Sequence, residues 1–210
     1  MPPMSVTGSM TGTIVQVIPQ SEGGRLSLTC GPTSALSRVA AVASFDSARF
    51  RQVLGHFPTG VTVVTGTADG APHGMTIGSF TSVSLEPPLV GFLPQASSPS
   101  WQAISGSGAF CVNVLGQDQG DLCWRFAKTN DEGKFDGLEW RPADSGSPIL
   151  HGVIAWIDCT IESIQDMGDH QFVLGRVSHL DTWDGLEPAP LLFFRGKLGG
   201  FLPEPPGFPG

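Results

Sequence analysis

The sequence predicts a mainly β protein, folded as an antiparallel barrel of about seven strands with a few short helices. Three observations support this fold class. The chain contains 28 Gly and 18 Pro, which favour many turns and short strands over a helical bundle. Short apolar and β-branched runs alternate with turn residues along most of the chain. No Gly-rich turn of the GxGxxG type follows a strand, so a Rossmann domain is not supported.

Composition limits the classes of partner. With 210 residues and 40% hydrophobic content, the chain predicts one domain with a sizeable core. Its net charge of −8 argues against nucleic acid or an anionic membrane as a partner. Since no apolar run approaches the roughly 20 residues that span a bilayer, we expect no membrane insertion.

Three regions are predicted. Residues 1–43 are rich in Gly, Ser, Thr and Pro and are expected to form a flexible extension. The folded domain is expected over residues 44–202, and the Pro/Gly-rich residues 203–210 form a tail. The four cysteines, Cys30, Cys111, Cys123 and Cys159, lack metal-site spacing, so we predict no metal and a reducing, cytoplasmic setting.

The first elements of the domain are a helix and a hairpin. The helix has one apolar stripe, formed by Phe50, Val53, Leu54 and Phe57. Ser44 or Asp46 can cap its start, and Pro58 prevents its continuation. A strand follows at Val61–Thr65, and the turn at Ala68–Gly70 leads back into the next strand.

The middle of the chain alternates strands and helices. Leu85–Pro88 ends one strand sharply, and the apolar run Leu89–Leu93 predicts a buried strand. Ser98 and Pro99 have the pattern of an N-cap and first helical residue, for a short helix through Ile104. Further on, we expect a strand at 110–115, an amphipathic helix at 118–127 and an irregular segment at 133–140.

The last third is predicted to complete the sheet. Val153–Ile164 is expected to be a long strand, with Ile157 and Cys159 on one face and Asp158 on the other. A tight turn at Gly168–His170 leads into a strand at 172–180, and the run at 190–194 closes the sheet.

The hydroxyl-rich stretch Gly74–Ser84 is the first candidate site. It carries five hydroxyl side chains and two glycines but no charge. Such a composition suits backbone that lies against a flat polar ligand, because glycine allows close approach and hydroxyls supply neutral hydrogen bonds. An ordinary Ser/Thr-rich edge strand is the alternative interpretation.

A phosphate could be held at the predicted helix that starts after Ser98, because a helix N-terminus presents free amides. No Lys or Arg occurs between Arg51 and Arg125. A phosphate there would therefore depend on amides, on Ser97, Ser98 and Ser100, or on a basic group from elsewhere in the chain. A simple capped helix is the alternative.

His170 is the strongest catalytic candidate, because a Gly-Asp-His turn can direct its ring into a cleft beside Asp169. A surface turn histidine is the alternative. The remaining histidines, His56, His73, His151 and His179, do not have the spacing of metal ligands, and we treat them as structural. No nucleophile elbow is present, so hydrolysis has little support.

Four motifs in order resemble the flavin reductase-like family, the short-chain NAD(P)H:flavin oxidoreductases of two-component monooxygenases. They lie at Phe57–Thr65, Gly74–Ser84, Phe110–Leu115 and Gly168–Val177. The resemblance covers roughly Ser44 to Leu202. Segments 100–104 and 190–196 are most similar to reductases that serve actinobacterial steroid-phenol hydroxylases.

The resemblance implies an FMN-binding split barrel, a homodimer with flavin near the subunit interface, and a defined set of site residues. The flavin ring would be lined by Thr76, Ile77, Gly78, Ser79 and Phe80, with Ser82 and Val83 beside them. Ser97, Ser98, Ser100 and Trp101 would lie near the phosphate. His170 would contact the nicotinamide nucleotide, and Phe193, Phe194, Arg195 and Gly196 would border the same pocket.

The function expected is hydride transfer from NADH or NADPH to FMN or FAD, with reduced flavin released to a partner monooxygenase. Two alternatives stay open from the residues alone. One is a flavin-binding module that acts as sensor or store, and the other is an oxidase of the pyridoxamine-phosphate type.

Overall fold

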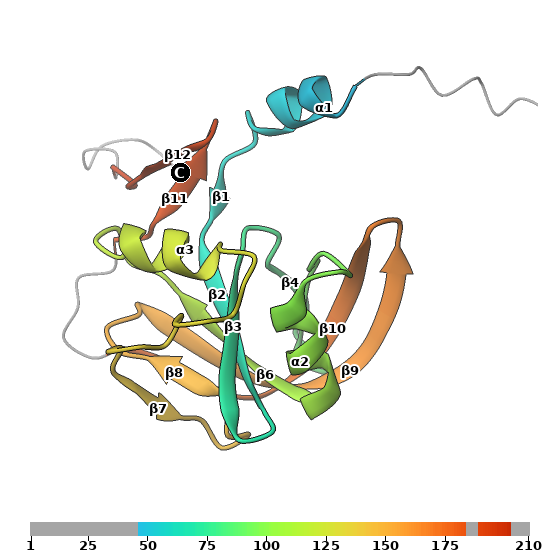
Figure 1. The fold of residues 1–210 in the computed structure, drawn as a ribbon, viewed down its shortest axis with the longest axis vertical. Helices are drawn as coiled ribbons and strands as arrows, with labels where there is room; N and C mark the ends of the chain where they lie inside the picture. Colours follow the sequence, from blue (N-terminus) through green and yellow to red (C-terminus); the bar gives the residue numbers. More distant parts are fainter. Residues whose placement is uncertain (1–45, 184–188, 203–210) are drawn as a thin grey trace, which may run out of the picture. The chain divides into compact units, whose positions relative to one another are not determined.

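A seven-stranded antiparallel sheet forms the centre of the molecule, in the order β3-β2-β6-β9-β10-β5-β4 (Figure 1). The computed structural model describes residues 46–183 and 189–202. The predicted extension at 1–43 and tail at 203–210 lie outside the described residues. The strands are β2 (Thr62–Ala68), β3 (Ala71–Ile77), β4 (Thr81–Ser84), β5 (Leu89–Phe92), β6 (Ala109–Val114), β9 (Ala155–Met167) and β10 (His170–Thr182).

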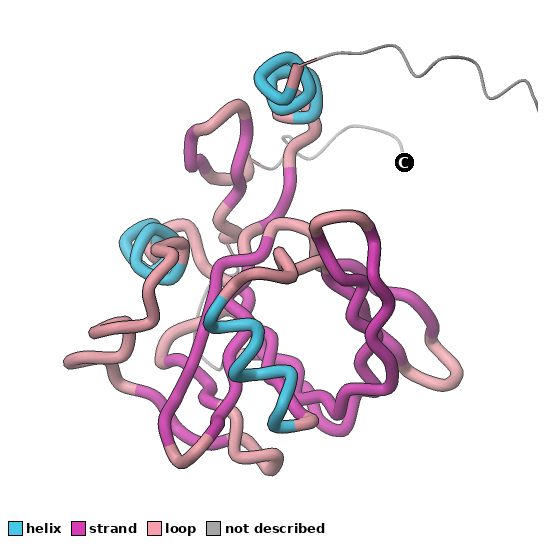
Figure 2. Tube along the Cα trace, turned by 45° about the vertical axis from the view of Figure 1, so that its right-hand side comes forward, coloured by secondary structure: helices cyan, strands magenta, loops and turns pink. Residues whose placement is uncertain are grey.

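The sheet curves into a barrel whose two edge strands, β3 and β4, are joined by a short bend (Figure 2). This bend, Gly78–Phe80, divides the predicted hydroxyl-rich stretch between two strands. The hydroxyl of Ser79 accepts from the Leu93 amide (2.9 Å) and donates to the Leu93 carbonyl (3.3 Å). One side chain thus ties the bend to the end of β5.

Both faces of β2 are buried, which explains its continuous run of β-branched residues. Val64 faces the barrel interior with Phe92, Trp101 and Phe110. Val63 faces the opposite way, into a second cluster with residues of the third helix. A strand covered on two sides has no need for the polar alternation of a half-exposed strand.

Three helices occur in the described part of the chain: α1 (Ser47–Leu54), α2 (Pro99–Ser107) and α3 (Gly120–Phe126). Asp46 caps α1 by accepting from the Arg49 amide at 2.6 Å, as predicted. Ser98 caps α2, with Pro99 as its first residue, which is also as predicted. The helix α2 runs beyond the predicted end at Ile104, because its stop is Gly108 in the left-handed region (φ 78°).

The apolar stripe of α1 does not pack into the core. No residue of α1 is buried, and Val53 and Leu54 are 51% and 54% exposed. The periodicity predicted the helix correctly, but no residue of its apolar face is buried in the described structure. Local pattern does not say which surface an amphipathic helix covers.

A strand forms within the predicted range 190–194, but the prediction that it closes the main sheet was wrong. This strand, β11 (Leu192–Phe194), joins β1 (Thr59–Gly60) and β12 (Lys197–Gly199) in a separate three-stranded sheet. The register pairs Thr59 with Phe193. This small sheet therefore extends from the start of β2, and the main barrel is completed without it.

Two further differences concern the segment before β9. The irregular segment ends in a short hairpin that was not predicted, β7 (Trp140–Pro142) paired with β8 (Pro148–Leu150). Asp158, expected on a polar face of β9, is completely buried. The Ser145 amide and hydroxyl donate to its carboxylate, at 3.1 and 2.5 Å, so the turn between β7 and β8 covers that face.

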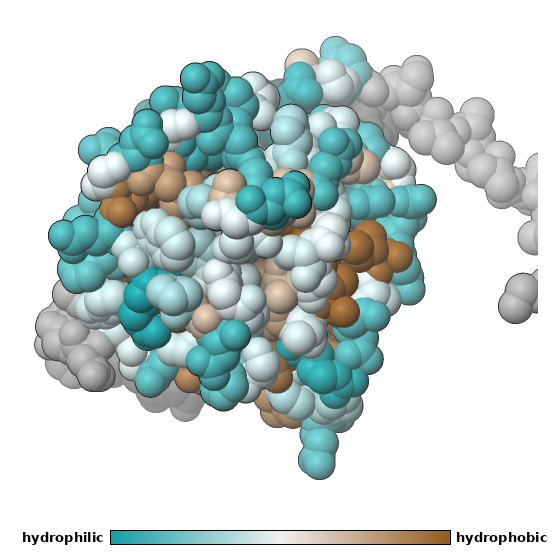
Figure 3. All heavy atoms as spheres, turned by 60° about the horizontal axis from the view of Figure 1, so that its bottom comes forward, coloured by the Kyte–Doolittle hydropathy of each residue, from teal (hydrophilic) through white to brown (hydrophobic). Residues whose placement is uncertain are grey.

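Surface hydrophobicity is dispersed on the face that Figure 3 presents, where hydrophilic residues separate small apolar groups. Of the helices that the structure describes, none has the length and apolar character required to cross a bilayer.

Candidate functional site

A cavity of about 840 Å³ is lined by three segments far apart in the sequence and by His170 at the start of β10. One segment is the end of β3 with the following bend, the second precedes and begins α2, and the third follows α3. Seven residues predicted from the sequence line it: Thr76, Ile77, Gly78, Ser79, Ser97, Ser98 and His170.

The hydroxyls of the first segment serve the fold as well as the cavity. Thr76 donates through Oγ1 to the Cys123 carbonyl of α3 at 2.7 Å, and Ser79 is bonded to Leu93. Each oxygen still has capacity to accept a hydrogen bond. Gly78 lines the cavity with no side chain, so a ligand can approach the backbone closely. The edge-strand and ligand-groove interpretations therefore describe the same residues.

The start of α2 presents a helix N-terminus to the cavity. Ser98 is the N-cap, and its hydroxyl accepts from the Trp101 amide at 3.4 Å. Ser97 and Pro99 complete this wall. The positive end of the helix dipole and the first-turn amides favour an anion at this position.

The third wall supplies the basic group that sequence reasoning did not identify. Lys128 and Thr129, just after α3, line the cavity. Lys128 is the only Lys or Arg among the described residues that line it. Its signal in the sequence was its position: it is the first lysine after a long stretch without basic residues, at the predicted end of a helix.

His170 lies at the tip of the β9–β10 hairpin and borders the cavity. Its Nδ1 is 2.8 Å from Oδ1 of Asp169, and this contact lowers the pKa of the Asp169 carboxyl. Backbone hydrogen bonds fasten the tip to the segment before α2: Ala96 N–H to Asp169 O and Gln171 N–H to Pro94 O, both 3.0 Å. The predicted position of the ring at a cleft agrees with this geometry.

Ser100 and Trp101 lie behind the wall and do not line the cavity, although the sequence suggested a phosphate contact. Both are 1% exposed. The Ser100 hydroxyl donates to Oδ1 of Asp131 at 2.6 Å, and the Trp101 indole donates to the Gln171 side chain at 2.6 Å. Their observed contacts are structural, because both residues lie on the buried face of the first turn of α2.

The other predicted site residues also lie outside the lining of this cavity. Phe80 packs on the barrel core, and Ser82 and Val83 are exposed on β4. Phe193 and Phe194 belong to β11, and Arg195 and Gly196 form the turn that follows. Within one chain the small sheet keeps these four residues away from the cavity, and their role in binding stays a prediction.

A partly buried polar group stands behind the cavity wall, and we call it the Lys134 cluster: His73, Ser100, Asp131 and Lys134. Oδ2 of Asp131 is 2.5 Å from Nδ1 of His73, and its Oδ1 is 3.3 Å from Nζ of Lys134. Burial tends to raise the pKa of Asp131, but hydrogen bonds from Ser100 and His73 and the charge of Lys134 outweigh it, so that pKa is lowered. Burial lowers the pKa of Lys134, against the opposing effect of Asp131.

Among the residues that the structure describes, no group of His, Cys, Asp or Glu could hold a metal ion. Cys111, Cys123 and Cys159 are free and buried. Burial raises the pKa of Cys159 to about 12, which makes it a poor nucleophile. The site therefore offers hydroxyls, amides, one ammonium and one imidazole, a set suited to binding and orienting a polar planar molecule with an anionic group.

The family is established by comparison with known proteins. The model of the flavin reductase like domain matches residues 54–201, and the chain therefore belongs to this family. A flavin reductase of Pseudomonas putida is 54% identical over 159 residues, which cover 75% of this chain and 92% of that protein. The reductase subunit HsaB of a flavin-dependent monooxygenase from Rhodococcus jostii is 49% identical over 164 residues, covering 78% and 83%.

Solved structures agree with this assignment. A homologue of nitrilotriacetate monooxygenase component B from Mycobacterium thermoresistibile has a TM-score of 0.73 at 46% identity, covering 78% of this chain and 90% of that one. The NADH:FAD oxidoreductase SgcE6 of Streptomyces globisporus, in complex with NAD and FAD fragments, has a TM-score of 0.70 at 37% identity, covering 76% and 94%. The split-barrel fold predicted from the sequence is confirmed.

Proposed function

We propose that this protein is an NADH-dependent flavin reductase that reduces FMN or FAD and releases the reduced flavin to a separate monooxygenase component. The observation that carries the proposal is the cavity itself. It brings the hydroxyl-rich bend, the start of α2, Lys128 and His170 together in a chain of the flavin reductase like family. Relatives described as NADH:FMN oxidoreductase and as the reductase subunit HsaB support the direction of the reaction and the partner class.

A bound flavin would supply the chemistry, as the acceptor of a hydride from the reduced nicotinamide. The chain has to bind and orient two rings at contact distance, and such orientation can lower a barrier by about 7–11 kcal/mol. Thr76, Gly78 and Ser79 would lie along the flavin ring. Backbone amides in this segment, directed at the N1–C2=O edge, would stabilise negative charge on the reduced flavin.

The phosphate of the flavin fits best between the start of α2 and Lys128. An ammonium adds a charge-assisted hydrogen bond to the neutral bonds from Ser97 and Ser98. Lys128 is exposed on a loop, so its attraction is screened by salt and is readily broken. This combination gives moderate affinity, which suits a flavin that enters and leaves in each catalytic cycle.

His170 is proposed to position the dinucleotide. Its side chain is 43% exposed at the cavity rim, so an incoming nicotinamide nucleotide can reach it without displacing core residues. The described residues that line the cavity include no pair of basic side chains for the 2′-phosphate of NADPH, and NADH is therefore proposed as the donor. No acid or base role for His170 is needed in this mechanism.

We propose a homodimer as the working form. In the part of the chain that the structure describes, Val53 and Leu54 of α1 are about half exposed, and Phe57, next to the helix, is 74% exposed. Phe194 in the small sheet is 44% exposed. A second copy could cover these residues and bring Phe193–Gly196 to the site that the family resemblance implies. Light scattering on the wild type and on Leu54→Glu tests this, and a monomeric wild type would refute it.

A cytoplasmic setting is part of the proposal, in keeping with three buried free thiols and the use of a nicotinamide nucleotide. The monooxygenase component is proposed as a transient partner that takes up reduced flavin. The chemistry of the cavity does not select its substrate.

The decisive experiment is steady-state NADH oxidation by the purified protein with FMN, FAD or riboflavin added. We expect turnover that saturates with added flavin, and faster turnover with NADH than with NADPH. A tightly retained flavin with no NADH oxidation would instead identify a sensor or store. Oxidation of pyridoxamine phosphate would identify the third class, and either result would refute the reductase.

A further inference from the structure

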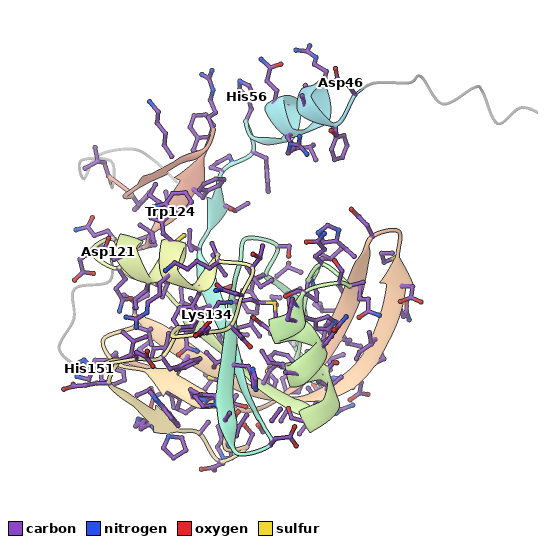
Figure 4. All side chains as sticks on the ribbon, viewed as in Figure 1. Asp46, His56, Asp121, Trp124, Lys134 and His151 are labelled. Carbon is purple, nitrogen blue, oxygen red and sulfur yellow. The ribbon has the colours of Figure 1, made fainter. Side chains whose placement is uncertain are left out.

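Lys134 is a buried cation that does not line the cavity. The residue is 2% exposed, and Figure 4 shows it between α3 and β3. Its Nζ donates to the Gly74 carbonyl and to the Ser100 hydroxyl, both at 3.0 Å, and lies 3.3 Å from Oδ1 of Asp131. An ammonium has three donors, so these three partners satisfy it completely.

Each of the three partners belongs to a different wall of the cavity. Gly74 immediately precedes the lining residue Met75 on β3, and Ser100 immediately follows Pro99 at the start of α2. Asp131 is two residues beyond Thr129 in the third wall. One buried ammonium therefore connects all three segments, immediately behind their lining residues.

The third wall depends most on this connection. Its two ends are closed by the rings of Phe126 and Phe135, whose centroids are 5.1 Å apart, and Arg125 donates to the Gly133 carbonyl at 3.0 Å. Lys128 and Thr129 lie between these ends and are exposed. Asp131, bonded to His73, Ser100 and Lys134, is the point at which this segment is fixed to the other walls.

Stability alone does not account for a buried lysine here. A buried ion pair is often no more stabilising than apolar residues of similar volume, because both charges must be removed from water. Such a pair fixes geometry more strongly than it stabilises the fold, since its directions and distances are restricted. Because this pair lies behind a binding site, the restricted geometry can fix the positions of the residues that line the site.

We propose that Lys134 and Asp131 are positioning residues for the flavin cavity, which hold the Lys128–Thr129 wall in register with β3 and the start of α2. The proposal rests on the proposed function, because it concerns the affinity of the same site. Neither residue contacts the flavin. They act through the placement of Lys128, Thr129 and the α2 amides.

The test compares Lys134→Met and Asp131→Asn with Asp158→Asn in the full-length protein. Asp158 is the matched control, because it is also a buried charge with hydrogen-bonded partners but fixes a turn that lines no part of the cavity. Affinity for FMN is measured by quenching of flavin fluorescence, and KM and kcat by NADH oxidation. Thermal unfolding of each variant is recorded in parallel.

We expect Lys134→Met and Asp131→Asn to raise the Kd and KM for FMN by about tenfold or more, since a buried partner is left unpaired and the wall shifts. The value of kcat at saturating FMN should fall by much less. Asp158→Asn should lower thermal stability and leave the Kd for FMN unchanged. Ser100→Ala, which removes one acceptor of Lys134, should raise the Kd for FMN by a smaller factor. This variant tests the proposal if Lys134→Met does not fold.

An unchanged Kd for FMN in the Lys134, Asp131 and Ser100 variants would overturn the proposal, as would an equal rise of Kd in Asp158→Asn. The proposed function fails by a different result, namely no flavin-dependent NADH oxidation by the wild type. The two failures are therefore distinguishable.

Discussion

Two buried charges, Asp158 and Lys134, have surroundings that differ in a way that indicates function. Asp158 on β9 is completely buried, and its carboxylate accepts from the Ser145 amide and hydroxyl in one short turn. Lys134 contacts three segments that are distant in sequence, all adjacent to the cavity. Asp158 fixes a local conformation, whereas Lys134 fixes the relative positions of three walls.

The difference teaches that burial and hydrogen-bond satisfaction alone do not identify a functional residue. Both side chains are satisfied, as buried polar groups usually are. What distinguishes them is the function of the segments that they connect. Variants on the cavity side should change ligand affinity together with stability, and variants elsewhere should change stability alone.

Gly74→Ala should give the largest effect. A Cβ at Gly74 would lie 2.7 Å from Cε1 of Phe126, so the ring at the start of the third wall has to move. We expect a loss of about 1–3 kcal/mol in the free energy of unfolding, because overpacking a core forces strained side chains. Affinity for FMN should fall as well. Urea unfolding and flavin fluorescence measure the two effects.

The control for Gly74→Ala is Gly66→Ala, whose Cβ would lie 2.9 Å from Cγ2 of Ile104, away from the cavity. It should lower stability to a similar degree and leave the Kd for FMN unchanged. Equal losses of FMN affinity in the two variants would contradict the distinction between the two regions.

Lys128→Ala should raise the KM for FMN by about tenfold, because one charge-assisted hydrogen bond to the phosphate is lost. The KM for riboflavin, which has no phosphate, should not change. Increasing salt should weaken FMN binding by the wild type but have less effect on the variant. Lys197→Ala, an exposed lysine on β12, is the control. An equal rise of KM for riboflavin would place Lys128 away from the phosphate.

His170→Ala should raise the KM for NADH by about fivefold, the loss expected for one partly exposed hydrogen bond. The Kd for flavin should change less. His179→Ala is the matched control, because His179 also lies beside an aspartate, with its Nδ1 3.4 Å from Asp144, but does not line the cavity. An unchanged KM for NADH would remove the positioning role.

The smallest effect is expected from acid. The pKa of Asp131 is lowered below its ordinary value of 3.8 in the folded protein, through Ser100, His73 and Lys134. Its contribution to stability is therefore complete above that ordinary value and is lost as pH falls through the lower folded pKa. Urea unfolding at decreasing pH should show this loss in the wild type. Asp131→Asn should lack it, and parallel curves for both proteins would argue against the shift.

Much of the fold could be predicted because local patterns determine it. The caps Asp46 and Ser98, the turn at Asp69–Gly70 and the alternating runs each specify an element within a few residues. The partners of α1 and β11 could not be predicted. An apolar stripe or strand indicates that a face will be covered, but the covering surface is a tertiary property.

The cavity lining could be predicted in part, where its residues are contiguous in sequence. The bend at 76–79, the residues before α2 and His170 all line the cavity as expected. Neither Lys128 nor the Lys134 cluster was identified from the sequence. Both depend on the segment after α3, which lies near β3 and the start of α2 in space but far from them in sequence. Ser100 belongs to the same serine-rich segment as Ser98, yet its side chain points inward. The position of a residue around the helix determines this difference, and composition does not reveal it.

Among the described residues that line the cavity, Lys128 alone supplies an ammonium, and its side chain is exposed. Such weak binding would affect how long the product stays in the cavity. A product that is held by one screened charge and several neutral hydroxyls has a short residence time, and its departure does not require a domain to open. Under the proposed function, reduced flavin would leave the cavity readily and reach the monooxygenase component by diffusion.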